Sequence, residues 1–391
     1  FKKIVDQKKS DDECIENIDI GGHTLIRSAA KNYKYVTVIC DPQDYLIFIK
    51  EMKKFNGKTS LRFRKMLSKK AFEMIYRYDK NISYWFNKNL LKKEINYKTV
   101  TLKYGENPHQ NSNLYLNKKY LGPLNCTQLN KKVLSYNNIN DANAALLCIS
   151  NFQKKPTSVI VKHKNPCGVA SSNNIIDAFK KSICCDPISA FGGIIAVNRK
   201  INEKFAKKLN NFKIDIIIAP QFTQKSLNIL KNKKKLIILK LNKYKYESKL
   251  SETKNVIGGY VKQDSDNIII NKKFFKCVTK NKVGKKILDD MIFAFTISKY
   301  VNSNAVVIVK NQQILGIGAG QTNRLESIKI AIKKMKKHFP NSKNYVLASD
   351  GFLPFIDNIK ILKNNYCKAI IQPGGSINDA KIINIANLLN I

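Results

Sequence analysis

One lysine–histidine pair has the residue types and the setting that acid–base chemistry needs. Lys162 and His163 directly follow a β-branched run at 158–161, and Asn-Pro-Cys-Gly follows at 165–168, so we expect the pair at a strand end before a loop. Imidazole titrates near neutral pH, and an adjacent ammonium group can stabilise a developing oxyanion or protonate a leaving amine. The pattern predicts a general base with a cationic partner. The alternative is a histidine packed under a loop beside a solvated lysine.

Five further segments combine glycine or proline with polar side chains and are typical of ligand-binding loops. They are Lys103–Gln110 (KYGENPHQ), Asp186–Gly193 (DPISAFGG), Ile314–Arg324 (ILGIGAGQTNR), Ser349–Asn358 (SDGFLPFIDN) and Gln372–Asp379 (QPGGSIND). Glycine lets backbone approach a ligand closely, and the glycine-rich loop would present Arg324, at the start of a helix, to an anion. This loop lacks the P-loop ending and the Rossmann spacing. Each segment has a plainer alternative as a lead-in loop, turn, hairpin exit, aromatic corner or helix cap.

A basic helix near the start of the chain is a further candidate site. Glu16–Gly22 ends in a Gly-Gly loop, and a helix rich in small residues follows at 25–32. Arg27 and Lys31 lie one helical turn apart on it, which predicts a site for an anionic ligand. The alternative is a helix with a solvated basic face.

Strands and helices alternate along the chain, which predicts an α/β fold with ligand-binding loops at strand ends. Expected strands lie at 158–161, 193–197, 214–219, 236–241, 305–309, 314–318, 345–348 and 368–371. Expected helices lie at 141–153, 175–182, 284–300, 325–337 and 379–389. In the first hundred residues we expect a strand at 35–40, helices at 43–55 and from 59–60 to 85–86, and a linker at 87–98.

Length and composition restrict the class of protein. A chain of 391 residues, 43% of them hydrophobic, predicts two or three domains, and the absence of an apolar run near the ~20 residues of a membrane span excludes an integral membrane protein. Nine cysteines and four histidines show neither zinc-ligand spacing nor a disulfide framework, which predicts no metal and a reducing compartment. The first residues contain no initiator Met and no signal peptide, which predicts a fragment of a cytoplasmic chain.

The net charge of +42 raises a polyanion-binding protein as an alternative function. The type of base argues against it, because nucleic-acid readers favour arginine for its planar fork. Lysine mixed with Asn and Ile instead follows AT-rich codon usage. The chain contains six arginines, namely Arg27, Arg62, Arg64, Arg77, Arg199 and Arg324.

Taken in order, these segments resemble, over nearly the whole chain, the bifunctional enzymes of purine biosynthesis that join phosphoribosylaminoimidazolecarboxamide (AICAR) formyltransferase to IMP cyclohydrolase. The motifs KYGENPHQ, KHKNPCG, DPISAFGG, IGIGAGQTNR, SDGFLPFIDN and QPGGSIND are jointly specific, and ENIDIGG with RSAAKN marks the cyclohydrolase end. The resemblance implies that residues 1–96 are the C-terminal part of a methylglyoxal-synthase-like (Rossmann-like) cyclohydrolase domain plus linker. Residues 97–391 would then be a formyltransferase domain of two cytidine-deaminase-like lobes.

The resemblance also implies the reaction and its residues. The co-substrate 10-formyltetrahydrofolate would give its formyl group to the AICAR amine, with His163 as general base and Lys162 stabilising the transition state and assisting the folate nitrogen as leaving group. Lys31 would act in cyclisation to IMP. Positions that match AICAR-binding residues are Lys103, Tyr104, His163, Gly192, Asp215, Asn304, Arg324 and Phe352. Positions that match folate-binding residues are Leu325, Asp357, Ser376 and Ile377, and those that match the IMP pocket are Asp19 and Ile20.

Three departures from the family pattern accompany this resemblance. Lys103 replaces an arginine, so that a bidentate phosphate contact becomes a point charge. We also expect truncation at both ends, without the cyclohydrolase phosphate loop and without a basic-aromatic C-terminal tail. The family builds its formyltransferase site across a homodimer without a catalytic metal, so we expect a cytoplasmic homodimer that binds AICAR and folate but neither membranes nor specific nucleic acid. The alternatives are the polyanion-binding protein and a folded remnant without activity.

Overall fold

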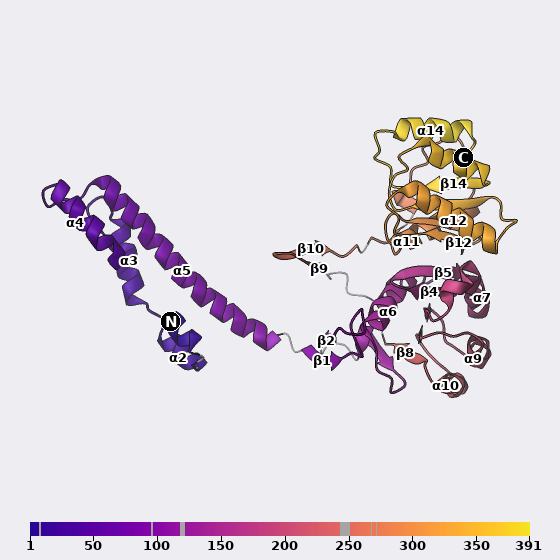
Figure 1. The fold of residues 1–391 in the computed structure, drawn as a ribbon, viewed down its shortest axis with the longest axis horizontal. Coiled ribbons are helices and arrows are strands. Elements are labelled where there is room, and N and C mark those ends of the chain that lie inside the picture. The colour runs from indigo at the N-terminus through magenta and orange to yellow at the C-terminus, as the bar shows by residue number, and fades with distance from the viewer. Residues whose placement is uncertain (8, 95–96, 118–121, 243–250, 267, 271) are drawn as a thin grey trace. The chain divides into compact units, whose positions relative to one another are not determined.

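The computed structural model describes residues 1–7, 9–94, 97–117, 122–242, 251–266, 268–270 and 272–391 (Figure 1). The chain divides into two compact units, Phe1–Asn96 (unit 1) and Tyr97–Ile391 (unit 2). Unit 1 is helical, whereas unit 2 is built around a large sheet.

Unit 1 contains no strand among its described residues. Its elements are α1 (Lys2–Asp6), α2 (Asp11–Glu16), α3 (Gly21–Lys31), the 3-10 helix η1 (Pro42–Asp44), α4 (Tyr45–Lys54) and α5 (Leu61–Glu94). A small core packs Ala30 of α3 and Val38 against Leu67 and Ala71 of α5. The two helices expected after residue 42 are confirmed.

The strand expected at 35–40 is wrong. A strand needs a neighbour to pair with, and no described strand lies beside this segment. Arg64 of α5 instead donates to the carbonyl oxygens of Tyr33 and Lys34, and Val38 turns into the small core. The segment is therefore held by a helix rather than by a sheet.

Two further expectations for unit 1 need correction. The expected linker at 87–98 is helical as far as Glu94, because its leucine, lysine and glutamate residues favour helix. Residues 95–96 lie outside the described part of the chain. Gly21 and Gly22 form the first turn of α3 rather than a loop facing it.

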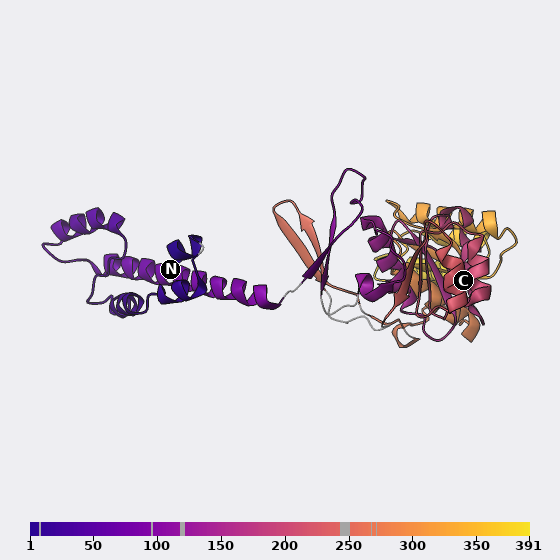
Figure 2. The same ribbon diagram turned by 90° about the horizontal axis from the view of Figure 1, so that it is seen from below.

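Within its described residues, unit 2 contains a mixed sheet of ten strands and two separate hairpins. The hairpins are β1 (Tyr97–Thr101) with β2 (Asn113–Asn117), and β9 (Ser251–Val256) with β10 (Gly259–Asp264). Figures 1 and 2 both show β9–β10 projecting away from the sheet. The sheet order is β14-β13-β11-β12-β5-β4-β6-β7-β8-β3. Parallel pairing joins β6 to β7, β7 to β8 and β13 to β14, and the other neighbours are antiparallel.

The sheet is made of two lobes with a common order of elements. After η2 (Pro123–Asn125) and β3 (Cys126–Gln128), the first lobe runs α6 (Tyr136–Ile149), β4 (Thr157–Lys162), β5 (Asn165–Ser171), α7 (Ile175–Cys185), α8 (Pro187–Ala190), β6 (Ile194–Val197), α9 (Glu203–Asn210), β7 (Ile216–Ala219), α10 (Gln224–Lys231) and β8 (Ile237–Leu241). The second runs η3 (Lys272–Phe274), α11 (Lys285–Ser298), β11 (Val306–Lys310), β12 (Gln313–Gly318), α12 (Arg324–His338), β13 (Tyr345–Ser349), α13 (Ile356–Asn364), β14 (Cys367–Ile371) and α14 (Asp379–Leu388).

Strand pairing makes the two lobes an internal repeat. In each lobe the first strand pairs antiparallel with the second and the third, and the third runs parallel to the fourth. The second strands, β5 and β12, meet antiparallel at the centre of the sheet. The lobes are thus related by an approximate two-fold axis at this junction.

Successive side chains of each strand point to opposite faces of the sheet, so the buried residues form a separate core on each face. Val159 and Val161 of β4 lie in a cluster under α6 and α11, whereas Ile160 faces the layer of α7 and α9. Helices α12, α13 and α14 cover the corresponding face of the second lobe. The α/β class is confirmed, as are the eight expected strands and five expected helices. The sequence reading missed the hairpin strands, β3, β5, α8, α9, α10 and α13.

Gly168 of β5 is required for helix packing, because a Cβ there would overlap the carbonyl oxygen of Ser182 in α7. Gly316 of β12 meets Ala331 of α12 in the same way. We expect Gly168→Ala to lower the free energy of unfolding by about 2 kcal/mol, the scale of an overpacked core. Urea unfolding measures this, with Gly284→Ala as the control, since nothing lies within 4 Å of a Cβ there. Equal midpoints for the two variants would contradict the packing argument.

Candidate active site

The lysine–histidine pair lies on a tight hairpin between β4 and β5. Lys162 ends β4, and the turn residues His163 and Lys164 both have left-handed backbone, with φ of 51° and 64°. The Pro/Gly loop expected after the pair is wrong, because residues 165–171 form β5. His163 is exposed, so the alternative of a histidine packed under a loop is also wrong.

Asp141 of α6 holds this turn through its backbone. Its Oδ2 accepts the N–H of His163 at 3.0 Å, and its Oδ1 accepts the N–H of Lys164 at 2.7 Å. Asn165 adds a hydrogen bond from its side-chain amide to the carbonyl of His163 at 3.1 Å. Left-handed backbone costs roughly 1–2 kcal/mol per non-glycine residue, and charge-assisted hydrogen bonds offset such a cost.

Two other predicted site residues, Gly192 and Asp215, lie near Lys162 at the same edge of the sheet. The Nζ of Lys162 donates to the carbonyl of Phe191 at 2.6 Å, and a Cβ on Gly192 would lie 4.0 Å from it. Burial raises the pKa of Asp215, while the charges of Lys162 and Lys213 oppose this rise. Gly192 and Asp215 precede β6 and β7, so this group lies at the amino ends of parallel strands rather than at the carboxyl ends expected for open α/β sheets.

The loop that carries Lys103 and Tyr104 is anchored on α6, the helix of Asp141. The carbonyl of Tyr104 accepts the N–H of Tyr136 at 3.2 Å, and the side chain of Asn137 donates to the carbonyl of Glu106 at 3.0 Å. The Lys103 ammonium lies 5.5 Å from the centre of the Tyr104 ring. One helix thus positions both this loop and the β4–β5 turn.

Lys162 and His163 line a cavity of about 310 Å³ whose other wall comes from the second lobe. On that wall Lys334 of α12 contacts Asp186 at 2.9 Å. Burial would raise the pKa of Asp186, but hydrogen bonds from Lys334 and Ser189 hold it below its ordinary value. Cys167 also lines the cavity, and burial raises the pKa of this thiol to about 12, so it stays protonated and is not a nucleophile.

Arg324 anchors a second group of predicted site residues. As expected, it begins a helix, although Gly316 and Gly318 of the glycine-rich segment lie in β12 and only residues 319–323 form a loop. One guanidinium nitrogen contacts the hydroxyl of Ser349 at 2.7 Å and the carboxylate of Asp350, and the other donates to Asn304 Oδ1 at 2.7 Å. Burial would raise the pKa of Asp350, but hydrogen bonds from Ser303 and Arg324 hold it below its ordinary value. Arg324 is therefore a fixed cation rather than a mobile one.

The predicted folate positions all lie in the second lobe, with Leu325 at the start of α12, Asp357 at the start of α13, and Ser376 and Ile377 on the loop after β14. Hydrogen bonds tie the loop after β13 to the loop after β14: the N–H of Leu353 donates to Gln372 Oε1 at 2.6 Å, and the Asn378 amide donates to the carbonyl of Pro354 at 3.1 Å. Phe352 and Ile377 are exposed on these loops. The side chain of Leu325 is half-buried and so is that of Ser376, whereas Asp357 is exposed at the start of α13.

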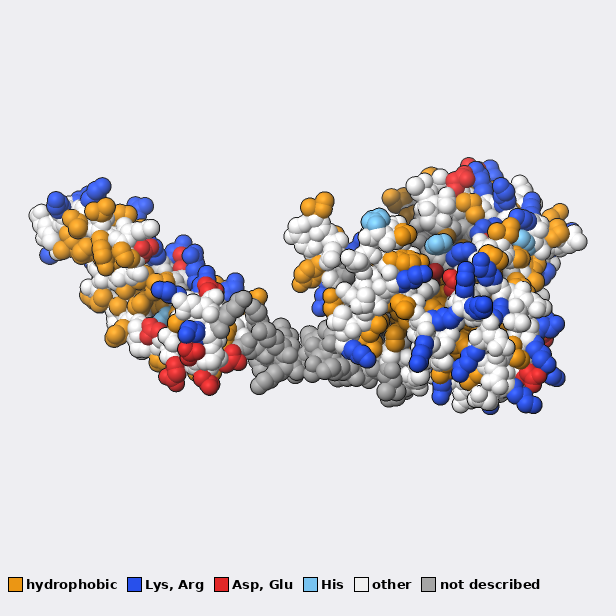
Figure 3. Space-filling view, turned by 60° about the horizontal axis from the view of Figure 1, so that its bottom comes forward, with side chains coloured by type: hydrophobic (Ala, Val, Ile, Leu, Met, Phe, Trp, Pro, Cys, Tyr) orange, Lys and Arg blue, Asp and Glu red, His pale blue; other side chains and the backbone are white. Residues whose placement is uncertain are grey.

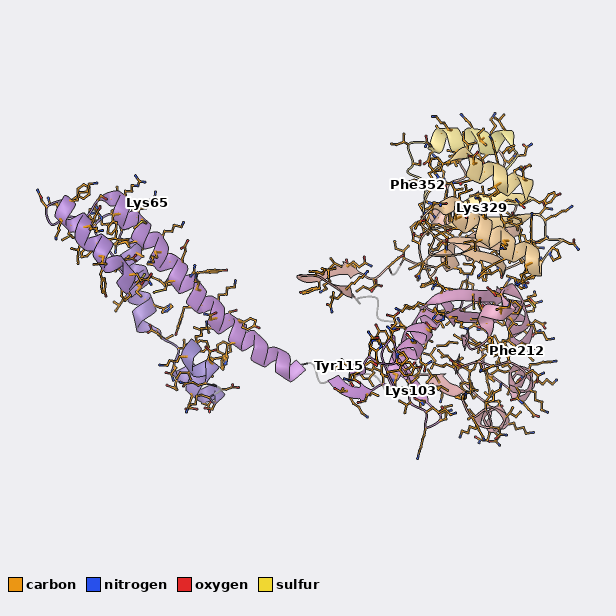
Figure 4. The ribbon with its side chains drawn as sticks, in the orientation of Figure 1. Lys65, Lys103, Tyr115, Phe212, Lys329 and Phe352 are labelled. Atoms are coloured by element: carbon orange, nitrogen blue, oxygen red, sulfur yellow. The ribbon has the colours of Figure 1, made fainter. Side chains whose placement is uncertain are left out.

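The predicted site residues of unit 2 therefore divide into two groups, one on each lobe, which we call the first-lobe cluster and the second-lobe cluster. The first-lobe cluster comprises Lys103, Tyr104, Lys162, His163, Gly192 and Asp215. The second-lobe cluster comprises Asn304, Arg324, Leu325, Phe352, Asp357, Ser376 and Ile377. None of the second-lobe cluster lines the cavity at His163. Figure 4 shows Lys103 and Phe352 on different lobes.

In unit 1 the structure places the predicted cyclohydrolase residues at opposite ends of one helix. Asp19 and Ile20 precede α3, and the Asp19 carboxylate accepts the N–H of Gly22 at 3.0 Å. Lys31 is the last residue of α3, so the helix axis from Gly21 to Lys31, roughly 15 Å at 1.5 Å per residue, lies between it and the Asp19–Ile20 end. These side chains do not form one compact group.

Sequence reasoning missed Asp141 and Lys334. Asp141 occupies a stretch of asparagine and alanine, Asn-Asp-Ala-Asn-Ala-Ala, in a chain whose acidic residues are scarce, at 28 against 70 basic ones. That scarcity was the available signal for Asp141. Lys334 gave no signal, because it is one lysine among many on a basic helix.

Within the described part of the chain, no cluster of three or more His, Cys, Asp or Glu side chains is arranged to hold a metal ion. None of the described helices is both long and apolar enough to cross a membrane.

An exposed imidazole beside a lysine, at a cavity between two α/β lobes, gives this fold the features of an enzyme that moves protons during group transfer. Comparison with known proteins identifies the family. The model of the AICARFT/IMPCHase bienzyme family matches residues 29–334. The chain belongs to this family, which confirms the predicted resemblance.

Curated relatives agree with the family match. The chain is 43% identical to the "Bifunctional purine biosynthesis protein PurH" of Caldicellulosiruptor bescii, over 97% of this chain and 75% of that protein. It is 43% identical to the protein of the same name from Thermoanaerobacter sp., over 99% of this chain and 76% of the relative, and 40% identical to that from Brucella ovis, over 96% and 73%. The chain thus spans about three quarters of their length.

Proposed function

We propose that unit 2 transfers the formyl group of 10-formyltetrahydrofolate to the 5-amino group of AICAR. The observation that carries this proposal is the exposed His163 imidazole beside Lys162 on a turn held by Asp141, at a cavity, in a chain of the AICARFT/IMPCHase family. His163 takes a proton from the amine as the amine nitrogen attacks the formyl carbon. The bond from that carbon to the folate nitrogen then breaks, and this nitrogen gains a proton to leave as tetrahydrofolate.

Lys162 and the remaining predicted residues supply charge and position. The Lys162 ammonium stabilises the oxyanion that forms on the formyl oxygen and assists the leaving nitrogen. Lys103, Tyr104, Gly192 and Asp215 hold AICAR from the first-lobe cluster, with Lys103 acting as a point charge where the family has arginine. From the second-lobe cluster, AICAR meets Asn304, Arg324 and Phe352, and folate meets Leu325, Asp357, Ser376 and Ile377.

A complete site requires two copies of the chain in this proposal. The two clusters carry complementary parts, a proton-transfer pair and a fixed arginine with one exposed aromatic ring, that of Phe352, yet the second-lobe cluster does not line the cavity at His163. A homodimer in which the first-lobe cluster of one copy meets the second-lobe cluster of the other would unite them.

The same proposal assigns the two domains: residues 1–96 belong to a cyclohydrolase domain of methylglyoxal-synthase-like architecture, and residues 97–391 form the formyltransferase domain of deaminase-like lobes.

In the complete bifunctional enzyme, formyl-AICAR then cyclises to IMP, with Lys31, Asp19 and Ile20 in that site. We place the enzyme in the cytoplasm, where this route supplies purine nucleotides. Lys and Arg side chains are spread over the visible face of unit 2 rather than gathered in one band (Figure 3), which supports a solvated basic surface rather than a nucleic-acid groove.

Complementation between variants tests the shared site. His163→Ala and Phe352→Ala each remove one cluster's part and should each be nearly inactive in formyl transfer from 10-formyltetrahydrofolate to AICAR. Mixed in equal amounts after subunit exchange, they should recover about a quarter of wild-type activity, because half of the dimers are mixed and each carries one intact site. Tetrahydrofolate release measures the rate. An inactive wild-type chain would refute the transfer, whereas active wild type without recovery on mixing would refute only the shared site.

A further inference from the structure

The two lobes hold corresponding turns by the same device. In the second lobe, Asp290 of α11 accepts the N–H of Asn311 at 2.7 Å and that of Gln312 at 2.8 Å. Both residues have left-handed backbone, with φ of 52° and 56°, and they form the β11–β12 turn. Asp141 of α6 does the same for His163 and Lys164 at the β4–β5 turn.

The preceding lysine is repeated as well. Lys310 ends β11 and its Nζ donates to the carbonyl of Lys343, in the segment that leads to β13, at 2.6 Å. Lys162 ends β4 and binds the carbonyl of Phe191, in the segment that leads to β6, at the same distance. The helix aspartate, the turn and its lysine are thus common scaffold. The lobes differ at the first turn residue, which is His163 in one and Asn311 in the other.

Because the turn residue is histidine in one lobe and asparagine in the other, comparing the lobes distinguishes a structural role of the aspartate from a role in the reaction. In both lobes its carboxylate satisfies two backbone N–H groups that a left-handed turn leaves unpaired. Only in the first lobe does the clamped residue carry an imidazole. Because a side chain in a two-residue turn follows its own backbone, the two bonds to Asp141 set where the His163 ring stands.

We propose that Asp141 is a positioning residue for formyl transfer: its carboxylate fixes the backbone of His163 and thereby holds the imidazole in line with the AICAR amine. This inference rests on the proposed function, since it assigns Asp141 to that reaction. Asparagine in its place keeps the shape but supplies one acceptor oxygen instead of two, so one N–H of the turn loses its partner. A displacement of about 1 Å at a reacting group can cost on the order of 100-fold in rate.

Asp290→Asn provides the matched control, because it removes the same bond from the equivalent turn, which carries no imidazole. We expect Asp141→Asn to lower kcat about 100-fold while the KM for AICAR changes less than about threefold. Asp290→Asn should keep kcat within about twofold of wild type, although Asp290 is the more buried carboxylate and its loss should lower the melting temperature at least as much.

The outcomes separate the two claims. If wild type does not transfer the formyl group, the proposed function fails and the inference fails with it. If wild type is active but Asp141→Asn keeps its kcat, or if Asp290→Asn loses as much, Asp141 is merely structural and the inference alone is overturned. Should Asp141→Asn not fold, Asp141→Glu, which keeps both oxygens but shifts them by one methylene, is expected to fold and to lose at least tenfold in kcat. Wild-type kcat in that variant would overturn the inference.

Discussion

Replacing His163 by alanine is expected to lower the rate of formyl transfer by about 10²–10⁴-fold, the usual contribution of a general base. His163 is exposed, and its backbone N–H keeps its bond to Asp141 in the variant, so the thermal midpoint should stay near that of wild type. The KM for AICAR should change far less than kcat, because the proton is transferred only in the transition state. Steady-state kinetics with AICAR and 10-formyltetrahydrofolate, together with a thermal melt, measure both quantities.

His338→Ala is the control for this experiment. It removes another imidazole, that of His338 in the last turn of α12, and His338 itself belongs to neither cluster. Its formyl-transfer rate should equal that of wild type. Retention of more than about a tenth of the activity by His163→Ala would fall short of the general-base range and remove His163 from the proposed mechanism.

Replacing Arg324 by methionine is expected to cost about 3 kcal/mol of folding stability at neutral pH, since breaking a buried ion pair leaves one charge without its partner. The side chains of Arg324 and Asp350 are only 11% and 21% exposed, and Asn304 and Ser349 lose a donor in the same change. Formyl transfer should also be lost, since Arg324 belongs to the second-lobe cluster. Urea unfolding and the transfer assay measure these two effects.

The stability loss in Arg324→Met should depend on pH. In wild type the pKa of Asp350 is held below its ordinary value, so the pair contributes stability above the unfolded carboxyl pKa, and this is lost as pH falls through the folded pKa. The gap between variant and wild type should therefore be widest near pH 7 and close in acid. Arg199→Met is the control, because the Arg199 guanidinium binds backbone carbonyls rather than a carboxylate. A gap that stays constant with pH would contradict the ion-pair argument.

Much of the unit 2 sheet could be predicted from local sequence, because its buried strands are short β-branched runs bounded by turn residues. Ile216–Ala219 and Val306–Lys310 are of this kind. β5 was not predicted because Asn-Pro-Cys-Gly has the composition of a loop. In the structure this segment pairs with β4, with an irregularity in the register beside Pro166. The segment 35–40 has strand composition but no strand partner among the described residues, and pairing is a property that local sequence does not carry.

The sequence offered candidate residues one by one but not their arrangement. The motif around Lys162 and His163 predicts acid–base chemistry, yet the turn that carries His163 is held by Asp141, 22 positions earlier in the chain. Likewise the Arg324 guanidinium binds the carboxylate of Asp350, 26 positions later in the chain, because the fold brings the start of α12 beside the end of β13. The internal repeat was invisible because its two copies share topology and a few polar residues rather than a run of sequence.

One hydrophobic cluster contains residues of both lobes. The ring centres of Phe152 and Phe293 lie 4.9 Å apart in it, and Leu146 and Ile297 belong to the same layer. The two lobes of the repeat therefore pack as one body. A change of side-chain volume beneath α11 can be transmitted through this layer to α6, whose Asp141 holds the backbone of His163. The second lobe, although it carries asparagine where the first carries histidine, thus supports the proposed general base through the core that the two lobes share.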